Sequence, residues 1–260
     1  MNRIFMYELR RLIWNKFFLG LLAINGIFGW YVLTTDIIAG VGYTAPFSLW
    51  SYGAYLASVT PLSILTVLFL LSIYYSQKEK QVEILTSAAP VNPVRYALVR
   101  IGAVTICFLL ICAVILAISM YFYYSLFDFI NFIPFLLPAV IVFVPCYLFA
   151  AGAGCLAGRI HQSLLYVLML VALLIGFIGV SGSFDFFGRG YFAGQPVSLP
   201  AGLDGEPAFV LGSWFWIARA VYLAVGILML AIGIFQGKIA KRLIHEIHLL
   251  CVNEKWIDKR

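Results

Sequence analysis

The sequence predicts an all-α membrane protein, built as a bundle of six transmembrane helices. Hydrophobic residues make up 63% of the 260 residues and charged residues only 11%, whereas soluble domains are about a quarter charged. A chain so poor in charge cannot cover a surface that faces water, so lipid must be the solvent for most of it. The arrangement of the apolar residues in long runs supports the same conclusion.

Six apolar runs are long enough to cross a bilayer. A helix rises about 1.5 Å per residue, so a hydrocarbon core about 30 Å thick needs about 20 apolar residues. The runs do not alternate as the strands of a membrane barrel would, which leaves helices. The fifth run is the shortest but contains no charged residue. The runs cover residues 17–38, 50–75, 98–125, 132–157, 164–180 and 214–236.

The basic residues predict the orientation of the bundle. With the N-terminus inside, fifteen of the seventeen lysines and arginines fall in cytoplasmic segments, and only Arg189 and Arg219 fall outside. Cytoplasmic segments of membrane proteins carry such an excess of positive charge. We therefore expect a multi-pass protein of the cell membrane (the inner, or cytoplasmic, membrane) with both termini in the cytoplasm.

Three segments flank the membrane-spanning domain or interrupt it. Residues 1–16 mix apolar and basic side chains, as a helix lying in the cytoplasmic interface does. Residues 237–260 repeat this pattern and predict a second, basic amphipathic helix near anionic headgroups. The outer loop 181–213, within the domain at 17–236, is rich in aromatic residues that would be costly in open water. We expect this loop to fold back onto the membrane surface or the bundle as a re-entrant cap.

Few polar residues lie within the predicted spans. Asn25 is the clearest of them, and a hydrogen bond to a neighbouring helix is the first expectation for its side chain. Pro61 interrupts the second span beside Thr60 and Ser63, whose hydroxyls can satisfy freed carbonyl groups. We take Asn25, Thr60 and Ser63 as the candidates for a translocation path.

Two glycines of the fourth span suggest close helix packing. Gly154 and Gly158 are four residues apart and so share one face of a helix. A face without side chains lets another helix approach closely. We expect a helix contact there.

No catalytic, metal or nucleotide site is apparent in the sequence. His245 and His248 are three residues apart, whereas a zincin needs histidines at i and i+4. The segment from Gly233 to Gly237 has three residues between the glycines instead of the four of a P-loop, and Ile239 stands where Ser or Thr is required. We predict that the chain is not an enzyme and binds no cofactor, and nothing in it suggests nucleic-acid binding.

The cytoplasmic loop 76–97 combines acidic and apolar residues. Glu79 and Glu83 are one helical turn apart and can face the same way on a short helix, with Val82 and Leu85 on its apolar edge. Pro90 then ends the helix. This pattern suits a docking surface, and the alternative is a simple solvated connector.

The loop resembles the first cytoplasmic loop of type-2 permeases of ATP-binding-cassette exporters. The matching residues are Glu83, Leu85, Ser87, Pro90, Val91, Arg95 and Arg100. The family often has Gly-Thr before the glutamate, where this chain has Gln81 and Val82. The six spans, the N-terminal amphipathic helix and the aromatic outer loop also resemble the layout of the family.

The resemblance implies a permease subunit that exports a hydrophobic or amphipathic substrate, such as a peptide, a drug or a lipid-like molecule. A separate ATPase subunit would bind ATP and Mg²⁺, a second permease subunit would complete the pathway, and membrane lipids would surround both. The residues implied are Glu79, Val82, Glu83, Leu85 and Pro90 for ATPase coupling, Arg10, Arg11 and Leu12 in a connecting helix, and Phe184, Phe186 and Phe187 at an outer gate.

Two other classes of function remain open. A secondary carrier would be driven by an ion gradient alone, although no carboxylate lies in the middle of a span, where proton-coupled carriers usually need one. A membrane scaffold or assembly factor would perform no transport. Co-isolation of the chain with an ATPase would distinguish the permease from both of these classes.

Overall fold

The computed structural model describes residues 2–76, 79, 81, 93–178, 182, 185–200 and 207–257, with side chains described as far as Phe235. All the secondary structure in these ranges is helical, as the sequence predicts. The elements are α1 (Asn2–Ile13), α2 (Lys16–Val32), a π-helical turn η1 (Leu33–Ile37), α3 (Leu49–Tyr74), α5 (Pro93–Phe127), a 3-10 turn η2 (Ile133–Phe135), α6 (Leu136–Ile160), α7 (Gln162–Ile178), α8 (Arg189–Ser198) and α9 (Ser213–Ile257).

Five helical segments in the described part of the chain are long and apolar enough to cross a membrane. They coincide with the first four predicted runs and with the last one. The fifth run forms α7, an apolar helix of 17 residues. The five segments are Lys16–Ile37, Leu49–Tyr74, Val94–Phe127, Ile133–Ile160 and Ser213–Phe235. The chain is therefore a multi-pass α-helical membrane protein.

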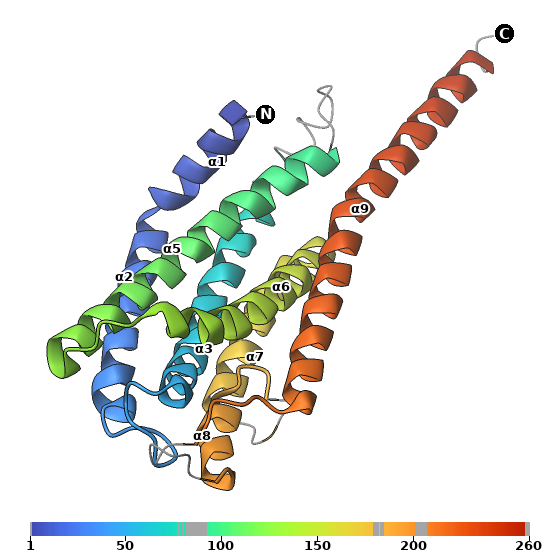
Figure 1. The fold of residues 1–260 in the computed structure, drawn as a ribbon. Helices are drawn as coiled ribbons and strands as arrows, with labels where there is room; N and C mark the ends of the chain where they lie inside the picture. The colour runs from blue at the N-terminus through green and yellow to red at the C-terminus, as the bar shows by residue number, and fades with distance from the viewer. Residues whose placement is uncertain are drawn as a thin grey trace.

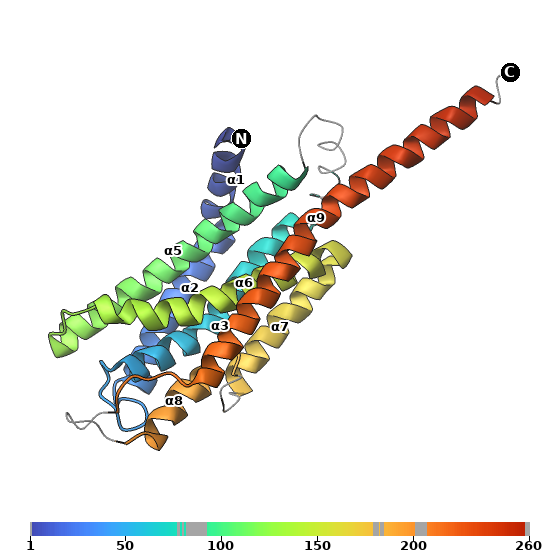
Figure 2. The ribbon, with the colours of Figure 1, turned by 45° about the vertical axis from the view of Figure 1, so that its right-hand side comes forward.

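Helix α3 lies in the centre of the bundle (Figures 1 and 2) and packs against α2, α5, α6, α7 and α8. Most of its residues are buried, because the helix is apolar all round and has no face that suits water. Its side chains form the middle of one continuous core. The other helices surround α3 and leave apolar side chains such as Ile27, Leu109 and Leu170 exposed on the outside of the bundle.

Glycines bring α6 close to its neighbours. A Cβ on Gly154 would lie 2.7 Å from a methyl carbon of Leu71 in α3, and one on Gly158 would strike the ring of Tyr75. The helix contact predicted for these two glycines is therefore present. A contact that the sequence analysis did not identify joins Gly226 of α9 to α6, where an added Cβ would lie 2.6 Å from the backbone of Leu148.

Helix α9 continues past the bundle. Its 45 residues make a rod about 68 Å long, and Figures 1 and 2 show its C-terminal half extending beyond the end where α1 and the start of α5 lie. The predicted tail, residues 237–260, is thus helical through Ile257 in direct continuation of the last span. No proline interrupts the helix here, so nothing in the sequence forces a turn.

The segment before α9 folds back onto the opposite end of the bundle, which we call the α8 end. Tyr191 stacks on Phe215 of α9 with ring centroids 4.0 Å apart, and Phe192 is fully buried against Gly53 of α3. Phe187 is also buried. These aromatic side chains are shielded from water, as the sequence analysis expects of this loop.

Candidate functional site

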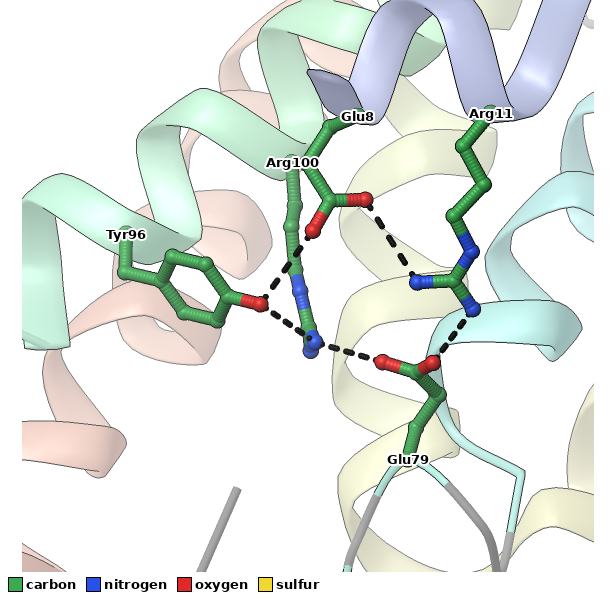
Figure 3. A network of polar contacts seen from close by, with 5 residues as sticks. All are labelled: Glu8, Arg11, Glu79, Tyr96 and Arg100. Carbon is green, nitrogen blue, oxygen red and sulfur yellow. Dashed lines mark hydrogen bonds and ion pairs between the residues drawn. The ribbon is translucent and has the colours of Figure 1, made fainter. Parts of the chain in front are cut away.

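Five polar side chains from three segments meet at the end of the bundle where α1 lies, which we call the α1 end. Figure 3 shows Glu8 and Arg11 from α1, Glu79 from the segment after α3, and Tyr96 and Arg100 from α5. We name this group the α1-end cluster. Its members are up to 92 residues apart in the chain and touch only because α1 lies along α5.

Glu79 is the central residue of the cluster. One carboxylate oxygen accepts a hydrogen bond from Arg11, and the other lies 2.7 Å from Nη2 of Arg100. Only 8% of the residue is exposed. A carboxylate bridged by two guanidinium groups in such a place forms strong, charge-assisted hydrogen bonds. Glu79 thereby joins the segment after α3 to both α1 and α5.

Glu8 and Tyr96 complete the cluster. The Tyr96 hydroxyl donates to Glu8 Oε1 at 3.2 Å and accepts from Arg100 Nη2 at 2.8 Å. Arg11 Nη1 lies 3.7 Å from the second oxygen of Glu8. The guanidinium of Arg100 also lies over the ring of Tyr74, 5.0 Å from its centroid, where cation–π attraction adds to the contact.

The charges within the cluster balance, since two carboxylates face two guanidinium groups. Burial opposes charge on Arg11, but the hydrogen bond and the negative charge of Glu79 outweigh it and raise the pKa of Arg11 above its ordinary value. A raised pKa keeps the guanidinium protonated into strongly alkaline solution, so Arg11 stays a charged donor to the Glu79 carboxylate and would lose that role only as the pH rises past its ordinary pKa. The cluster thus joins three segments through ion pairs and hydrogen bonds.

Of the predicted coupling residues, the one that the structure describes, Glu79, belongs to the α1-end cluster. The sequence pattern put Glu79 on a docking edge, but in the structure its carboxylate points into the chain, toward two arginines that are distant in sequence. The neighbouring Gln81 is exposed. Val82, Glu83, Leu85 and Pro90 lie outside the described residues, so their contact with an ATPase stays a prediction.

The three residues predicted in the connecting helix have different environments. Arg10 is exposed, Arg11 belongs to the α1-end cluster, and Leu12 is buried in the core. Exposed side chains with apolar bodies, among them Met6 and Tyr7, share the outer face of α1 with Arg10. Such a face suits the boundary between headgroups and acyl chains.

The candidate path residues are buried and hydrogen-bonded. Asn25 Nδ2 donates to Thr66 Oγ1 at 3.0 Å, and Ser63 Oγ donates to Asn25 Oδ1 at 3.0 Å. The expected hydrogen bond between neighbouring helices is therefore present, between α2 and α3. Thr60 instead donates to the carbonyl of Leu56 at 2.6 Å. Their place on a translocation path stays a prediction.

The predicted outer gate lies at the α8 end. Phe187 is buried and packs against Phe186, with ring centroids 4.9 Å apart. Phe186 also contacts Phe149 and Tyr222. Phe184 lies outside the described residues.

The sequence analysis did not identify several of the residues that hold segments in place at the α1 end and at the α8 end. Glu8 is the one acidic residue of α1 and lies on the face that packs against α5, a signal that could have been used. Tyr96 and Arg100 are four residues apart and so share a helix face. Arg219 was counted only as an outer positive charge, and nothing in the sequence indicates that it is buried.

Within the residues that the structure describes, five membrane-length apolar helices define the class of this molecule, a multi-pass α-helical membrane protein. Comparison with protein-family models, with curated proteins and with solved structures gave no match.

Proposed function

We propose that this chain is the permease subunit of an ATP-binding-cassette exporter, driven by a separate ATPase subunit. The observation that supports this most is the bridge from Glu79 to Arg11 and Arg100. It ties the loop that resembles an ATPase-docking loop to two helices of the bundle, one of which crosses the membrane. A loop that only connected two spans would need no such joint.

The joint suits the transmission of movement. A force on the segment after α3 would act on α1 and α5 through Glu79, because both carboxylate oxygens are engaged and the Glu79 and Arg100 side chains are largely shielded from water. Shielded ion pairs break at a greater cost than exposed ones. ATP and Mg²⁺ would be bound in the partner ATPase, and movement of the loop would open and close the pathway.

We count α7 as the sixth span, although it is shorter than the others. Its 17 residues extend about 25 Å, which is at the lower limit for a crossing. An even number of crossings would put both termini on one side, and the N-terminus and the end of α9 do lie toward the same end in Figure 1. The excess of basic residues makes that side the cytoplasm.

The pathway would form between two permease subunits, this chain contributing one half. The polar groups of the candidate path form hydrogen bonds with one another inside the chain. An open route through one subunit would have to break these hydrogen bonds. The described spans present mainly apolar side chains outward. A substrate that is hydrophobic or amphipathic fits such walls, whereas a strongly charged one does not.

Co-isolation and vesicle transport test the proposal together. The tagged chain is purified from native membranes, its co-purifying ATPase is identified by mass spectrometry, and ATP-driven export is measured in vesicles with Glu83→Arg and Gln81→Ala. We expect Glu83→Arg to abolish ATPase coupling and Gln81→Ala to preserve it.

Two results would contradict the proposal. If Glu83→Arg leaves export and substrate-stimulated ATP hydrolysis intact with the ATPase bound, the loop is not the coupling element. If no ATPase co-purifies, and an ion gradient alone drives transport or no transport occurs, the chain is a secondary carrier or a scaffold.

A further inference from the structure

A buried arginine holds the outer segment at the α8 end. Arg219, in the second turn of α9, is only 3% exposed. Its Nη1 donates to the carbonyl of Phe186 at 2.6 Å and its Nη2 to the carbonyl of Asp185 at 3.2 Å. The guanidinium also lies over the ring of Phe215, 4.6 Å from the centroid. One side chain therefore fastens two consecutive backbone carbonyls to α9.

The held segment is shaped for this contact. The carboxylate of Asp185, itself 3% exposed, accepts hydrogen bonds from the backbone N–H groups of Phe187 at 3.2 Å and Gly190 at 2.7 Å. These bonds fold residues 185–190 into a turn that leads into α8. In this turn the carbonyl groups of Asp185 and Phe186 face α9, where both accept hydrogen bonds from Arg219.

Gly188 lets the segment lie directly on the guanidinium. Its φ of 93° is in the left-handed region, and an added Cβ would lie 2.5 Å from Arg219 Nη2. A larger residue there would be strained and would also push against Arg219. The close fit is therefore specific to glycine.

Cys146 of α6 lies under this contact. Its Sγ donates to the carbonyl of Phe186 at 3.3 Å and lies 3.7 Å from Arg219 Nη1. The thiol is fully buried. The segment, Arg219 and Cys146 thus form one stack in which the segment covers the thiol.

We propose that Arg219 is a latch: when it releases the two carbonyls, the segment 185–198 lifts and the interior around Cys146 opens. The acceptors are neutral carbonyl groups, and no ion pair of Arg219 occurs among the described residues, so the latch lacks the strongest kind of partner. Its Nε, moreover, has no hydrogen-bond partner in the described part of the chain. Water can replace every bond that the guanidinium would lose. A role for this latch as an exit gate rests on the proposed function. The contact of Arg219 with the two carbonyl groups does not depend on that function.

Thiol labelling of the full-length protein in lipid nanodiscs tests the latch without an ATPase. A polar maleimide is added, and the modified cysteines are quantified by peptide mass spectrometry. We expect Cys146 to be protected in the wild type and labelled at least tenfold faster in Arg219→Met. Gly188→Ala keeps Arg219 but displaces the segment, and it should also increase the rate at which Cys146 is labelled. Arg219→Lys should give an intermediate rate, because an ammonium group cannot span both carbonyls as a planar fork does.

Two controls make the result specific. Cys155, buried further along α6, should stay protected in all variants. Arg189→Gln removes an exposed arginine from the same segment and should label like the wild type. The latch is wrong if folded Arg219→Met and Gly188→Ala proteins keep Cys146 protected, or if Cys155 becomes labelled as fast as Cys146, which would indicate general loosening. Neither result bears on ATPase coupling, so the two proposals fail separately.

Discussion

Glu79 Oε2 and Arg100 Nη2 are 2.7 Å apart, with both side chains at most 12% exposed. Glu79→Gln keeps the size of the side chain and removes its charge, which leaves Arg11 and Arg100 without this counter-charge. We expect a loss of stability of about 1–3 kcal/mol, measured as thermal unfolding in detergent. Gln81→Ala, an exposed substitution in the same segment, should change stability by less than about 0.5 kcal/mol. Equal effects of the two variants would show that the bridge contributes nothing.

The contact between α6 and α9 should be intolerant of a single methyl group. An alanine at Gly226 would place its Cβ 2.6 Å from the backbone carbon of Leu148 and 2.6 Å from the nitrogen of Phe149. Backbone atoms cannot move aside as a flexible side chain can, so we expect Gly226→Ala to cost about 1–3 kcal/mol.

Gly20 of α2 offers the matched control, because no atom from another described part of the chain lies within 4 Å of its ideal Cβ. Gly20→Ala should be neutral, or stabilising by up to about 1 kcal/mol through helix propensity. Unfolding of both variants by SDS titration measures the difference. A tolerant Gly226 would mean that α6 and α9 pack less closely than described.

The hydrogen bonds of Asn25 should contribute modestly to the packing of α2 on α3. Asn25→Ala removes its bonds to Ser63 and Thr66, and we expect a cost of about 0.6–2 kcal/mol. A double-mutant cycle with Ser63→Ala isolates the pair. Thr35→Ala, which loses only a bond from η1 to the Tyr31 carbonyl one turn earlier in the chain, should have a smaller effect. Additivity in the cycle would contradict a direct interaction.

The ion pair between Asp36 and Arg189 should be nearly neutral. The two groups are 3.3 Å apart, but both side chains are almost half exposed, so water and salt screen them. A double-mutant cycle with Asp36→Asn and Arg189→Gln should give a coupling below about 1 kcal/mol that disappears in 1 M salt. A large coupling that persisted in salt would make this pair a second fastening of α8.

The fold class and the spans are predictable from the sequence because they depend on solvent. Long apolar runs have to become helices in lipid, whatever their neighbours are, and five of the six runs are membrane-length helices in the structure. The packing of Gly154 and Gly158 was also predictable, since helical spacing alone puts them on one face. The buried aromatic loop followed from the cost of exposing such rings to water.

The partners of individual polar residues were not predictable. Glu79 looked like part of an exposed docking edge, and only the packing of α1 along α5 brings Arg11 and Arg100 to its carboxylate. Arg219 looked like an ordinary outer charge, and only the return of the segment 185–190 gives it two carbonyl groups.

The sequence by itself thus determined what each segment is: its helical form, its place in lipid and, through the basic residues, its expected direction. These properties depend on local composition and on the solvent. The tertiary structure alone decided which segments meet, because a hydrogen bond or an ion pair acts over a few ångströms. Contacts of that range between residues such as Glu8 and Tyr96, 88 positions apart, exist only once the helices have packed.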